Sequence, residues 1–238
     1  MTIQELKPSA KKEGRWLIFL EDGTIIRVGE ADVASLGLYR GMELDGEQLR
    51  KLQDAAALSK LKTKALNIVS VRSLSRRELV KKLTARPRRT EDKEYLPEDS
   101  ETAWEELEAR AEVVAGWLEE LGLLNDEQYA RDVVRWCGEK GYGERRVRDE
   151  LFRRGVPREL WDEALESFSS SEEAIDRFLS QKLRRWDGDP KELKRAADAL
   201  ARRGFSWSEI SEALERFERE IGKEEGDELF GKLEDIDS

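Results

Sequence analysis

Arginine is the residue type whose spacing in this sequence points most directly to a binding chemistry. One close group and two adjacent pairs stand in the second half of the chain: Arg145, Arg146 and Arg148, then Arg153 and Arg154, then Arg202 and Arg203. A guanidinium group presents several donors that match phosphate and carboxylate oxygens in pairs. We therefore predict that these seven arginines contact an acidic partner. The alternative is a solvated helix face, with each pair placed favourably at a negative helix end.

The residue types that most catalytic and metal sites need are scarce. The 238 residues include no histidine and one cysteine, Cys137. Ser-His-Asp and Cys-His nucleophile systems are therefore excluded, as are an internal disulfide and a Cys-rich zinc site. The sequence has neither a calcium-binding loop motif nor a glycine-rich phosphate loop. We expect a protein that is not an enzyme and that uses no cofactor or metal, with Cys137 as a small buried apolar side chain.

Charge is segregated along the chain, although the formal net charge is only −10. Residues 60–89 carry +10, residues 91–128 carry −12, and residues 131–158 carry +4. The acidic segment 91–112 is typical of a solvated loop and helix face. Its alternative roles are mimicry of nucleic-acid charge or a cover over the basic face. Because no apolar run nears the ~20 residues that span a bilayer and no signal peptide opens the chain, we expect a cytoplasmic protein.

These arginines must be positioned by helices, since the sequence predicts a mainly α fold with one small β-hairpin. The hairpin covers residues 14–28, with the turn Glu21-Asp22-Gly23 between two β-branched and aromatic runs. A short helix follows within residues 30–45. From Gly46 onward, apolar residues recur every three or four positions. Helices are predicted from residue 46 to about 74, from the capping box Ser75-Arg-Arg-Glu78, over 98–121, from Asn125, and near 144–154, 157–168, 171–186, 190–203 and 206–220. The last of these helices begins at another capping box, Ser206-Trp-Ser-Glu209.

An internal repeat organises the second half. Residues 151–165 and 200–214, at a constant offset of 49, are identical at seven of their fifteen positions. In each copy a helix ends in Leu-x-Arg-Arg, a glycine supplies the turn, and another helix begins. A fainter copy precedes them, in which Leu83 and Trp117 match Leu151 and Trp161. We predict three tandem helical units in an elongated array, with the four repeat leucines buried: Leu151, Leu165, Leu200 and Leu214.

The predicted domain boundaries follow from these elements. We expect an N-terminal hairpin extension over 1–45 and a first helical unit over 46–129, which contains an acidic insertion at about 87–110. The second unit covers 130–170, the third covers 171–220, and an acidic tail covers 221–238. Among the seven tryptophans we expect Trp117 and Trp161 in the core. Trp104 and Trp186 are the ones expected on the surface.

Several of these motifs in combination resemble the RecX family, the regulatory proteins of the RecA recombinase. The resemblance covers about residues 65–217. Its markers are Ser75-Arg-Arg-Glu-Leu79, the run Leu118-Glu-Glu-Leu-Gly-Leu-Leu-Asn-Asp-Glu-Gln-Tyr-Ala130, Gly141-Tyr-Gly143, Leu151-x-x-Arg154-Gly155-Val156, and Arg202-Arg-Gly-Phe205 with Ile210. The hairpin followed by Leu38-x-x-Gly41-Met-Glu-Leu44 is similar to an N-terminal extension that some members carry. The insertion at 87–110 and the acidic tail depart from the family pattern.

The resemblance implies a protein that lies along the groove of a RecA filament on single-stranded DNA. There it would inhibit filament growth, strand exchange and ATP turnover, as a monomer, without a cofactor, and with weak direct DNA contact. A different class of function is a stand-alone helix-turn-helix module that binds nucleic acid, because each unit has two helices joined at a glycine. Against that alternative, the helices after Gly155 and Gly204 carry acidic and aromatic residues where base-reading side chains are expected.

Overall fold

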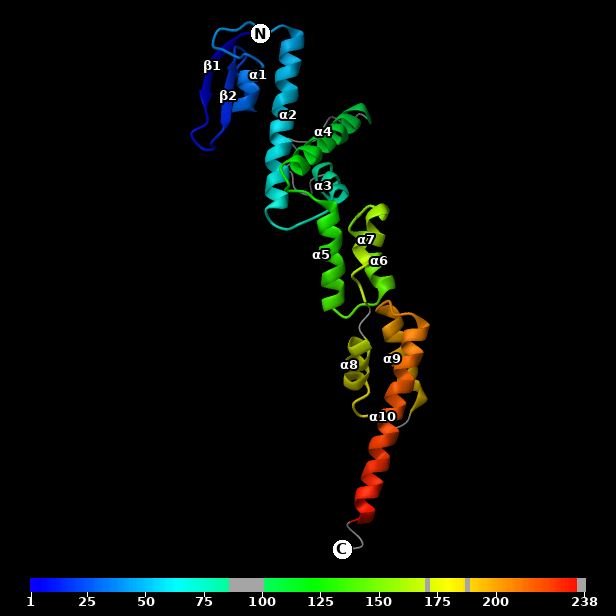
Figure 1. Cartoon of the computed structure of the whole chain (residues 1–238). Helices are drawn as coiled ribbons and strands as arrows, with labels where there is room; N and C mark the ends of the chain where they lie inside the picture. Colours follow the sequence, from blue (N-terminus) through cyan, green and yellow to red (C-terminus); the bar gives the residue numbers. More distant parts are fainter. Residues whose placement is uncertain (86–100, 170–171, 187–188, 235–238) are drawn as a thin grey trace. The chain divides into compact units, whose positions relative to one another are not determined.

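The computed structural model describes the backbone of residues 1–85, 101–169, 172–186 and 189–234, and the side chains of these segments up to Glu220. The chain divides into two compact units, Met1–Asn125 and Asp126–Ser238 (Figure 1). The described residues are mainly α-helical, with one small antiparallel sheet near the N-terminus, which confirms the predicted fold class. The predicted segment 87–100 of the acidic insertion lies outside the described residues.

The first unit begins with three antiparallel strands rather than a two-stranded hairpin. The predicted hairpin is present as β2 (Arg15–Leu20) and β3 (Ile25–Gly29), and β1 (Ile3–Pro8) adds a third strand beside β2. The sequence of β1 holds only two aliphatic residues among polar ones and ends in proline, so its alternation is weak. The sheet buries Ile3, Ile18 and Val28 on one face. This solves the problem that a two-stranded ribbon is marginal alone.

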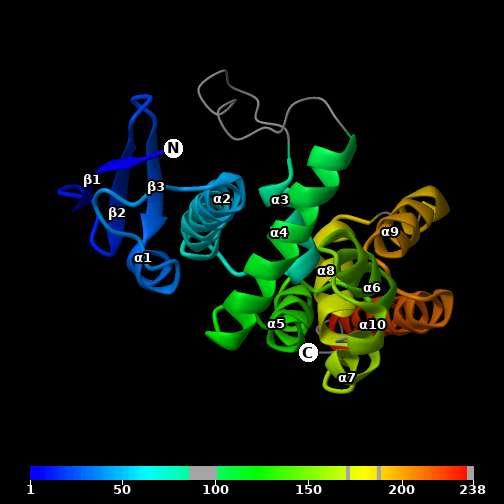
Figure 2. The same cartoon turned by 90° about the horizontal axis from the view of Figure 1, so that it is seen from above.

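Two helices, α1 and α2, cover this sheet, and the later part of α2 extends beyond it to pack against other helices. Helix α1 (Glu30–Ser35) is the predicted short helix, and α2 (Gly46–Val69) starts at a capping box in which the Asp45 carboxylate accepts the Gln48 N–H at 2.8 Å. Figure 2 shows α2 running beside β3. Leu52 of α2 is fully buried against the sheet residues. The first half of α2 therefore packs against the sheet, and its second half packs in a separate helical core.

That helical core is formed by α2, α3 (Arg76–Leu83) and α4 (Glu101–Glu120). The predicted cap at Ser75 is confirmed, since its hydroxyl accepts the Glu78 N–H at 3.1 Å. Glu78 itself forms ion pairs with Arg72 and Lys82. Leu79, Val114 and Leu118 are fully buried between the three helices. The faint first copy of the repeat is thus a packed three-helix group.

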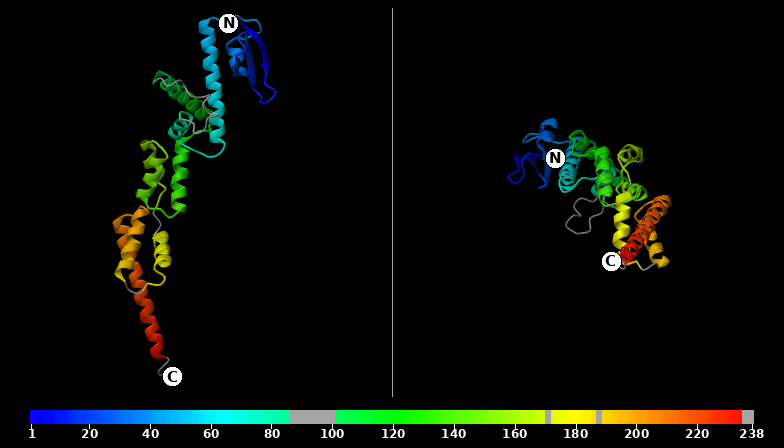
Figure 3. Two further views of the ribbon diagram at one scale, coloured as in Figure 1. Left: turned by 180° about the vertical axis from the view of Figure 1, so that it is seen from behind. Right: turned by 60° about the horizontal axis from the view of Figure 1, so that its bottom comes forward.

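The second unit contains two further helical groups. The first has α5 (Asp126–Glu139), α6 (Glu144–Arg153), a 3-10 turn η2 (Arg158–Leu160) and α7 (Trp161–Leu165). The second has α8 (Glu172–Lys182), α9 (Pro190–Arg202) and α10 (Trp207–Glu234), in which α8 packs against α9 and α10 (Figure 3). The predicted boundary at 129/130 lies inside α5, and α10 extends past residue 220 into the predicted tail. The division into three units remains a prediction.

The repeat predicted the core of this unit well, with two exceptions. Leu151 and Leu200 are fully buried, and the glycines that follow, Gly155 and Gly204, have φ of 72° and 92°. Leu165 and Leu214 are only half-buried, because each stands at the edge of its cluster. The expected helix over 157–168 is broken into η2 and the five-residue α7, since Pro157 starts it with a 3-10 turn.

The tryptophans also differ in part from the prediction. Trp117 and Trp161 pack against the cores as expected. Trp186 is half-buried, not exposed, because its indole N–H donates to the Asp189 carbonyl at 3.0 Å and its ring packs near Phe217. Trp104 is half-buried as well. The most exposed tryptophan among the described residues is Trp207, at 70% exposure.

No helix in the described ranges is long and apolar enough to cross a membrane.

Candidate partner-binding site

The two helical groups of the second unit meet through a backbone junction. The Gly143 N–H donates to the Arg203 carbonyl at 3.0 Å, and the Arg145 N–H donates to the Gly204 carbonyl at 3.2 Å. The unsatisfied carbonyls at the end of α9 therefore meet the unsatisfied N–H groups at the start of α6. Because the partial charges at these helix ends are opposite, the contact is also electrostatically favourable.

The junction requires glycine on both sides. A Cβ added to Gly143 would lie 2.4 Å from the Gly204 carbonyl, and a Cβ added to Gly204 would lie 2.3 Å from the Arg146 nitrogen. Those distances involve backbone atoms, so no side-chain rotation relieves them. The sequence predicts a turn at Gly204, whereas Gly143 appears there only within the family marker Gly141-Tyr-Gly143. The approach of two segments about 60 positions apart has no local sequence signal.

A concavity opens beside this junction, with a volume of about 300 Å³. We call it the arginine pocket, and its lining consists of Arg145, Arg146, Asp149, Ala201, Arg202 and Gly204. Arg145 and Arg202 are exposed, and within the described part of the chain neither forms an ion pair or a side-chain hydrogen bond. Two guanidinium groups from different helical groups thus face one concavity with their hydrogen-bonding capacity unused.

Three other predicted site residues are held by one buried carboxylate. The Glu150 side chain is 8% exposed and accepts hydrogen bonds from Arg146 at 2.9 Å, Arg153 at 3.1 Å and Arg154 at 3.3 Å. A buried carboxylate is tolerated when it is paired and hydrogen-bonded. Arg153, which is exposed, and Arg154, which is half-buried, are therefore both bound to a carboxylate of their own unit.

Arg154 is the most tightly held of the seven. Its guanidinium stacks 5.0 Å from the centre of the Trp136 ring and donates to the Tyr129 hydroxyl at 3.4 Å. Burial disfavours the charge on Arg154, but the hydrogen bonds and charges of Tyr129 and Glu150 outweigh it and raise the pKa of the guanidinium. Arg154 is consequently a fixed cation of the core boundary.

The remaining two predicted residues have their own partners. Arg148 pairs with Glu144 at 2.8 Å and lies 3.8 Å from Asp162. Arg203 lies over the Phe178 ring, 4.4 Å from its centre, in a cation–π contact. The structure therefore brings three of the seven predicted residues together in the pocket: Arg145, Arg146 and Arg202. The other four contact residues of their own chain outside the pocket: Arg148, Arg153, Arg154 and Arg203.

Cys137 is buried as expected, with no exposed surface. Burial, followed by the charge of Glu150, raises the pKa of its thiol to about 11. Since the thiolate is the nucleophilic form, this cysteine is inert at neutral pH.

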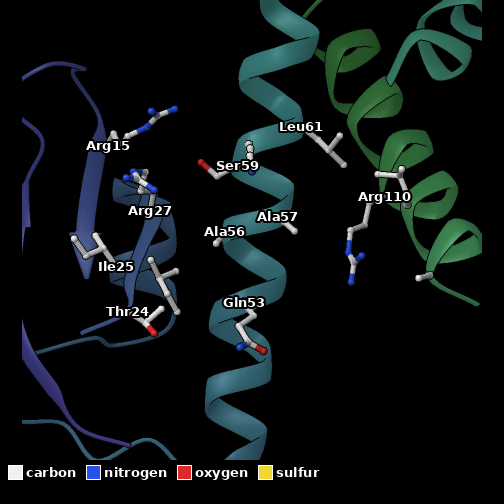
Figure 4. Close-up of a pocket in the computed structure, with 14 residues that line it drawn as sticks. Arg15, Thr24, Ile25, Arg27, Gln53, Ala56, Ala57, Ser59, Leu61 and Arg110 are labelled. Carbon is white, nitrogen blue, oxygen red and sulfur yellow. The ribbon is translucent and has the colours of Figure 1, made fainter. Parts of the chain in front are cut away.

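A second concavity lies in the first unit and was not anticipated from the sequence. Its volume is about 700 Å³, and it extends from the edge of β3 across α2 to α4 (Figure 4). Four of its lining side chains are cationic: Arg15, Arg27, Lys60 and Arg110. They come from four elements, β2, β3, α2 and α4, which explains why no local motif revealed them.

Comparison with known proteins places these features in a family. Residues 125–165 match the model of the second three-helix domain of RecX, and residues 170–214 match that of the third. The regulatory protein RecX of Stenotrophomonas maltophilia strain R551-3 is 33% identical over 153 residues, which are 63% of this chain and 82% of that protein. The chain belongs to the RecX family. This confirms the resemblance found in the sequence.

Other RecX proteins match over most of their length. The regulatory protein RecX of Caldanaerobacter subterraneus is 24% identical over 204 residues, covering 86% of this chain and 94% of that protein. A crystal structure of regulatory protein RecX has a TM-score of 0.67 and 24% identity, covering 90% of this chain and 98% of the other. That likeness shows a shared fold. The arginine pocket takes its residues from both matched three-helix domains, and the RecX relatives are named as regulatory proteins.

Proposed function

We propose that this RecX-family protein binds a RecA-type recombinase filament on single-stranded DNA and inhibits ATP turnover, strand exchange and filament growth. The family membership supports a regulatory role. The observation that carries the site is the convergence of Arg145 and Arg202 on one concavity, both without an internal partner among the described residues. Their partner is an acidic group on the filament, either a phosphate or a surface carboxylate.

The junction of Gly143 and Gly204 supports this assignment because it fixes the two arginines relative to each other. The Arg145 N–H itself makes one hydrogen bond of the junction, and Arg202 directly precedes Arg203, whose carbonyl accepts the other. A guanidinium pair that is already positioned loses less entropy on binding than two independent side chains. Arg146, paired with Glu150, also lines the pocket as a third cation. We assign Arg148, Arg153, Arg154 and Arg203 a supporting role in positioning these groups.

Titration of the recombinase ATPase on single-stranded DNA tests the proposal. The double reversal Arg145→Glu with Arg202→Glu should raise the concentration that half-inhibits the ATPase at least tenfold, which corresponds to about 1.4 kcal/mol. Arg177→Glu with Arg184→Glu is the matched control, since both residues are exposed arginines outside the pocket. Equal loss of inhibition in both double variants would mean that total charge matters and the pocket does not. Unchanged inhibition in the first would show that the assigned surface is wrong.

Binding to bare DNA separates this function from a stand-alone nucleic-acid-binding module. A module of that kind should bind bare DNA with affinity that falls steeply as salt rises. The regulator proposed here should bind recombinase-coated DNA much more tightly than bare DNA, as a monomer, with only weak direct DNA contact. It acts in the cytoplasm, where the filament forms.

A further inference from the structure

The concavity of the first unit combines a free strand edge with a cationic lining. β3 is the outer strand of the sheet, and four consecutive residues from Thr24 to Arg27 line the concavity. We propose that this groove binds an extended acidic peptide, which adds to β3 as a further strand. This site is separate from the arginine pocket and does not depend on the recombinase proposal.

The backbone groups available for strand addition follow from the sheet register. The Leu20 N–H donates to the Thr24 carbonyl at 2.9 Å, and Ile18 pairs with Ile26 two positions further on. In an antiparallel ladder, alternate residues of an edge strand bond to the neighbour and the others point outward. The outward groups are therefore the N–H and C=O of Ile25 and Arg27, and no hydrogen bond engages them in the described part of the chain.

The ends of this edge are closed, so the docking length is defined. At one end Gly23, the next outward position in the alternation, donates its N–H to the Leu20 carbonyl at 3.0 Å within the turn. At the other end the Gly29 N–H is occupied by the Asp32 carboxylate at 2.9 Å. An incoming strand thus finds two donors and two acceptors at alternate positions, the pattern used in peptide recognition by strand addition.

The groove has room for a peptide because α2 presents small side chains along its floor. Ala56 and Ala57 lie on one face of α2, at helical spacing from Gln53 and Lys60. In Figure 4, α2 lies between the strands and α4, and the short side chain of Ala56 points toward the strands while that of Ala57 points toward α4. The Ile25 side chain is 41% exposed beside this space and offers an apolar contact.

The charge of the groove selects an acidic peptide. Its described lining has four cations and no carboxylate. Arg27 is exposed and makes no ion pair with any described residue. Arg15 donates to the Thr63 hydroxyl at 3.3 Å, and this contact holds its guanidinium between the sheet and α2. Arg110, across the groove, is already paired with Asp54 at 2.7 Å, so Arg15 and Arg27 are the main contacts for an acidic strand.

The same geometry argues against a nucleic-acid strand in this groove. The outward carbonyl oxygens of Ile25 and Arg27 would face phosphate oxygens and repel them. A peptide strand instead supplies N–H groups to those carbonyls and carboxylates to the arginines. Strand pairing and charge complementarity are therefore satisfied together only by a peptide.

The test uses the full chain and a fluorescein-labelled peptide of about six residues, the length of an ordinary strand, that alternates glutamate with valine. Anisotropy should show saturable binding, and a peptide with lysine in place of glutamate should bind at least tenfold more weakly. Amide hydrogen exchange at Ile25 and Arg27 should slow when the acidic peptide is bound. Binding without protection of these two amides would overturn strand addition. Tighter binding of oligothymidylate than of the acidic peptide would overturn the choice of occupant.

Two matched pairs of variants locate the contact. Arg27→Glu should weaken peptide binding about tenfold, whereas Arg77→Glu, an exposed arginine of α3 outside the groove, should not. Ile25→Pro removes an outward N–H and leaves the ladder to β2 intact, so it should weaken binding about tenfold while Ile25→Ala does so much less. Circular dichroism and thermal unfolding report whether each variant is folded. If Arg27→Glu and Arg77→Glu bind equally, or if Ile25→Pro binds as Ile25→Ala does, the proposal fails.

Discussion

The two helical groups of the second unit, α5–α7 and α8–α10, carry the same Leu-x-Arg-Arg-Gly sequence, yet their arginines have different partners. Arg154 and Arg203 are equivalent at the offset of 49, and so are the aromatic residues that they contact, Tyr129 and Phe178. The position of Glu150, which holds three arginines, is taken by Ala199 in the later copy. A single missing carboxylate therefore leaves Arg202 unpaired among the described residues and available to a partner.

This comparison shows that a repeated motif fixes a fold position without fixing a chemical role. In both copies the first arginine ends a helix and the glycine turns the chain. What differs is the neighbour one helical turn earlier, which either neutralises the pair or leaves it charged. Arg202, which no described side chain pairs, then lines the same concavity as Arg145 beside the Gly143–Gly204 junction.

The largest expected effects concern the leucines that the repeats share. Leu151→Ala and Leu200→Ala remove fully buried side chains, and each should lower the free energy of unfolding by about 3–5 kcal/mol. Leu165→Ala and Leu214→Ala, at half-buried positions, should cost about 1–2 kcal/mol. Urea unfolding followed by circular dichroism measures both pairs. Equal costs at all four positions would mean that the two edge leucines are as enclosed in solution as the central ones.

The next effect concerns Glu150. Glu150→Gln leaves Arg146, Arg153 and Arg154 without their shared charge and should destabilise the protein by about 2–3 kcal/mol. The value falls below that for a fully buried pair because all three arginines are partly exposed. Glu144→Gln is the control, since Glu144 is an exposed partner of Arg148 and should cost under about 1 kcal/mol. Similar values for the two variants would show that burial of Glu150 does not matter.

Much of the fold was predictable because its signals are local. Apolar spacing, caps at Ser75 and Ser206, and the glycines before each second helix located nearly every helix of the described chain. Strand β1 escaped because its pairing with β2 is a tertiary contact and its own sequence is mostly polar. The short η2 and α7 differ from the expected long helix because a proline sets their entry.

The candidate site was predictable only in part. All three arginines of the pocket are conspicuous in the sequence, but nothing local distinguishes them from the four that pair with residues of their own chain. The distinction depends on which carboxylates lie within hydrogen-bonding distance and on the contact between Gly143 and Gly204. Both are properties of packing between segments far apart in the chain. Family resemblance identified the protein class, while the structure separated the paired arginines from the free ones.

The two copies should differ in how their stability depends on pH, because Cys137 of the earlier copy is titratable and its equivalent in the later copy, Trp186, is not. The pKa of the Cys137 thiol is raised to about 11, so the thiol form is favoured in the folded state. The stabilisation is fully present below the unfolded pKa of about 9 and is lost as pH rises toward 11. At pH 10 the loss should be about 1 kcal/mol relative to pH 7. Cys137→Ala should lack this part of the pH dependence, and identical profiles for both proteins would contradict it.

The smallest expected effect on stability comes from restoring the missing carboxylate in the later copy. Ala199→Glu places an acid three and four residues before Arg202 and Arg203, at the position equivalent to Glu150. Ala199 is half-buried, so the free energy of unfolding should change by less than about 1 kcal/mol in either direction. The new carboxylate should pair with Arg202 and lower its availability, raising the concentration that half-inhibits the recombinase ATPase roughly threefold. Ala199→Gln is the control, because it has the same length without the charge and should leave inhibition unchanged. If the two variants inhibit equally, the free charge of Arg202 does not distinguish the copies, and the bulk of residue 199 is what matters.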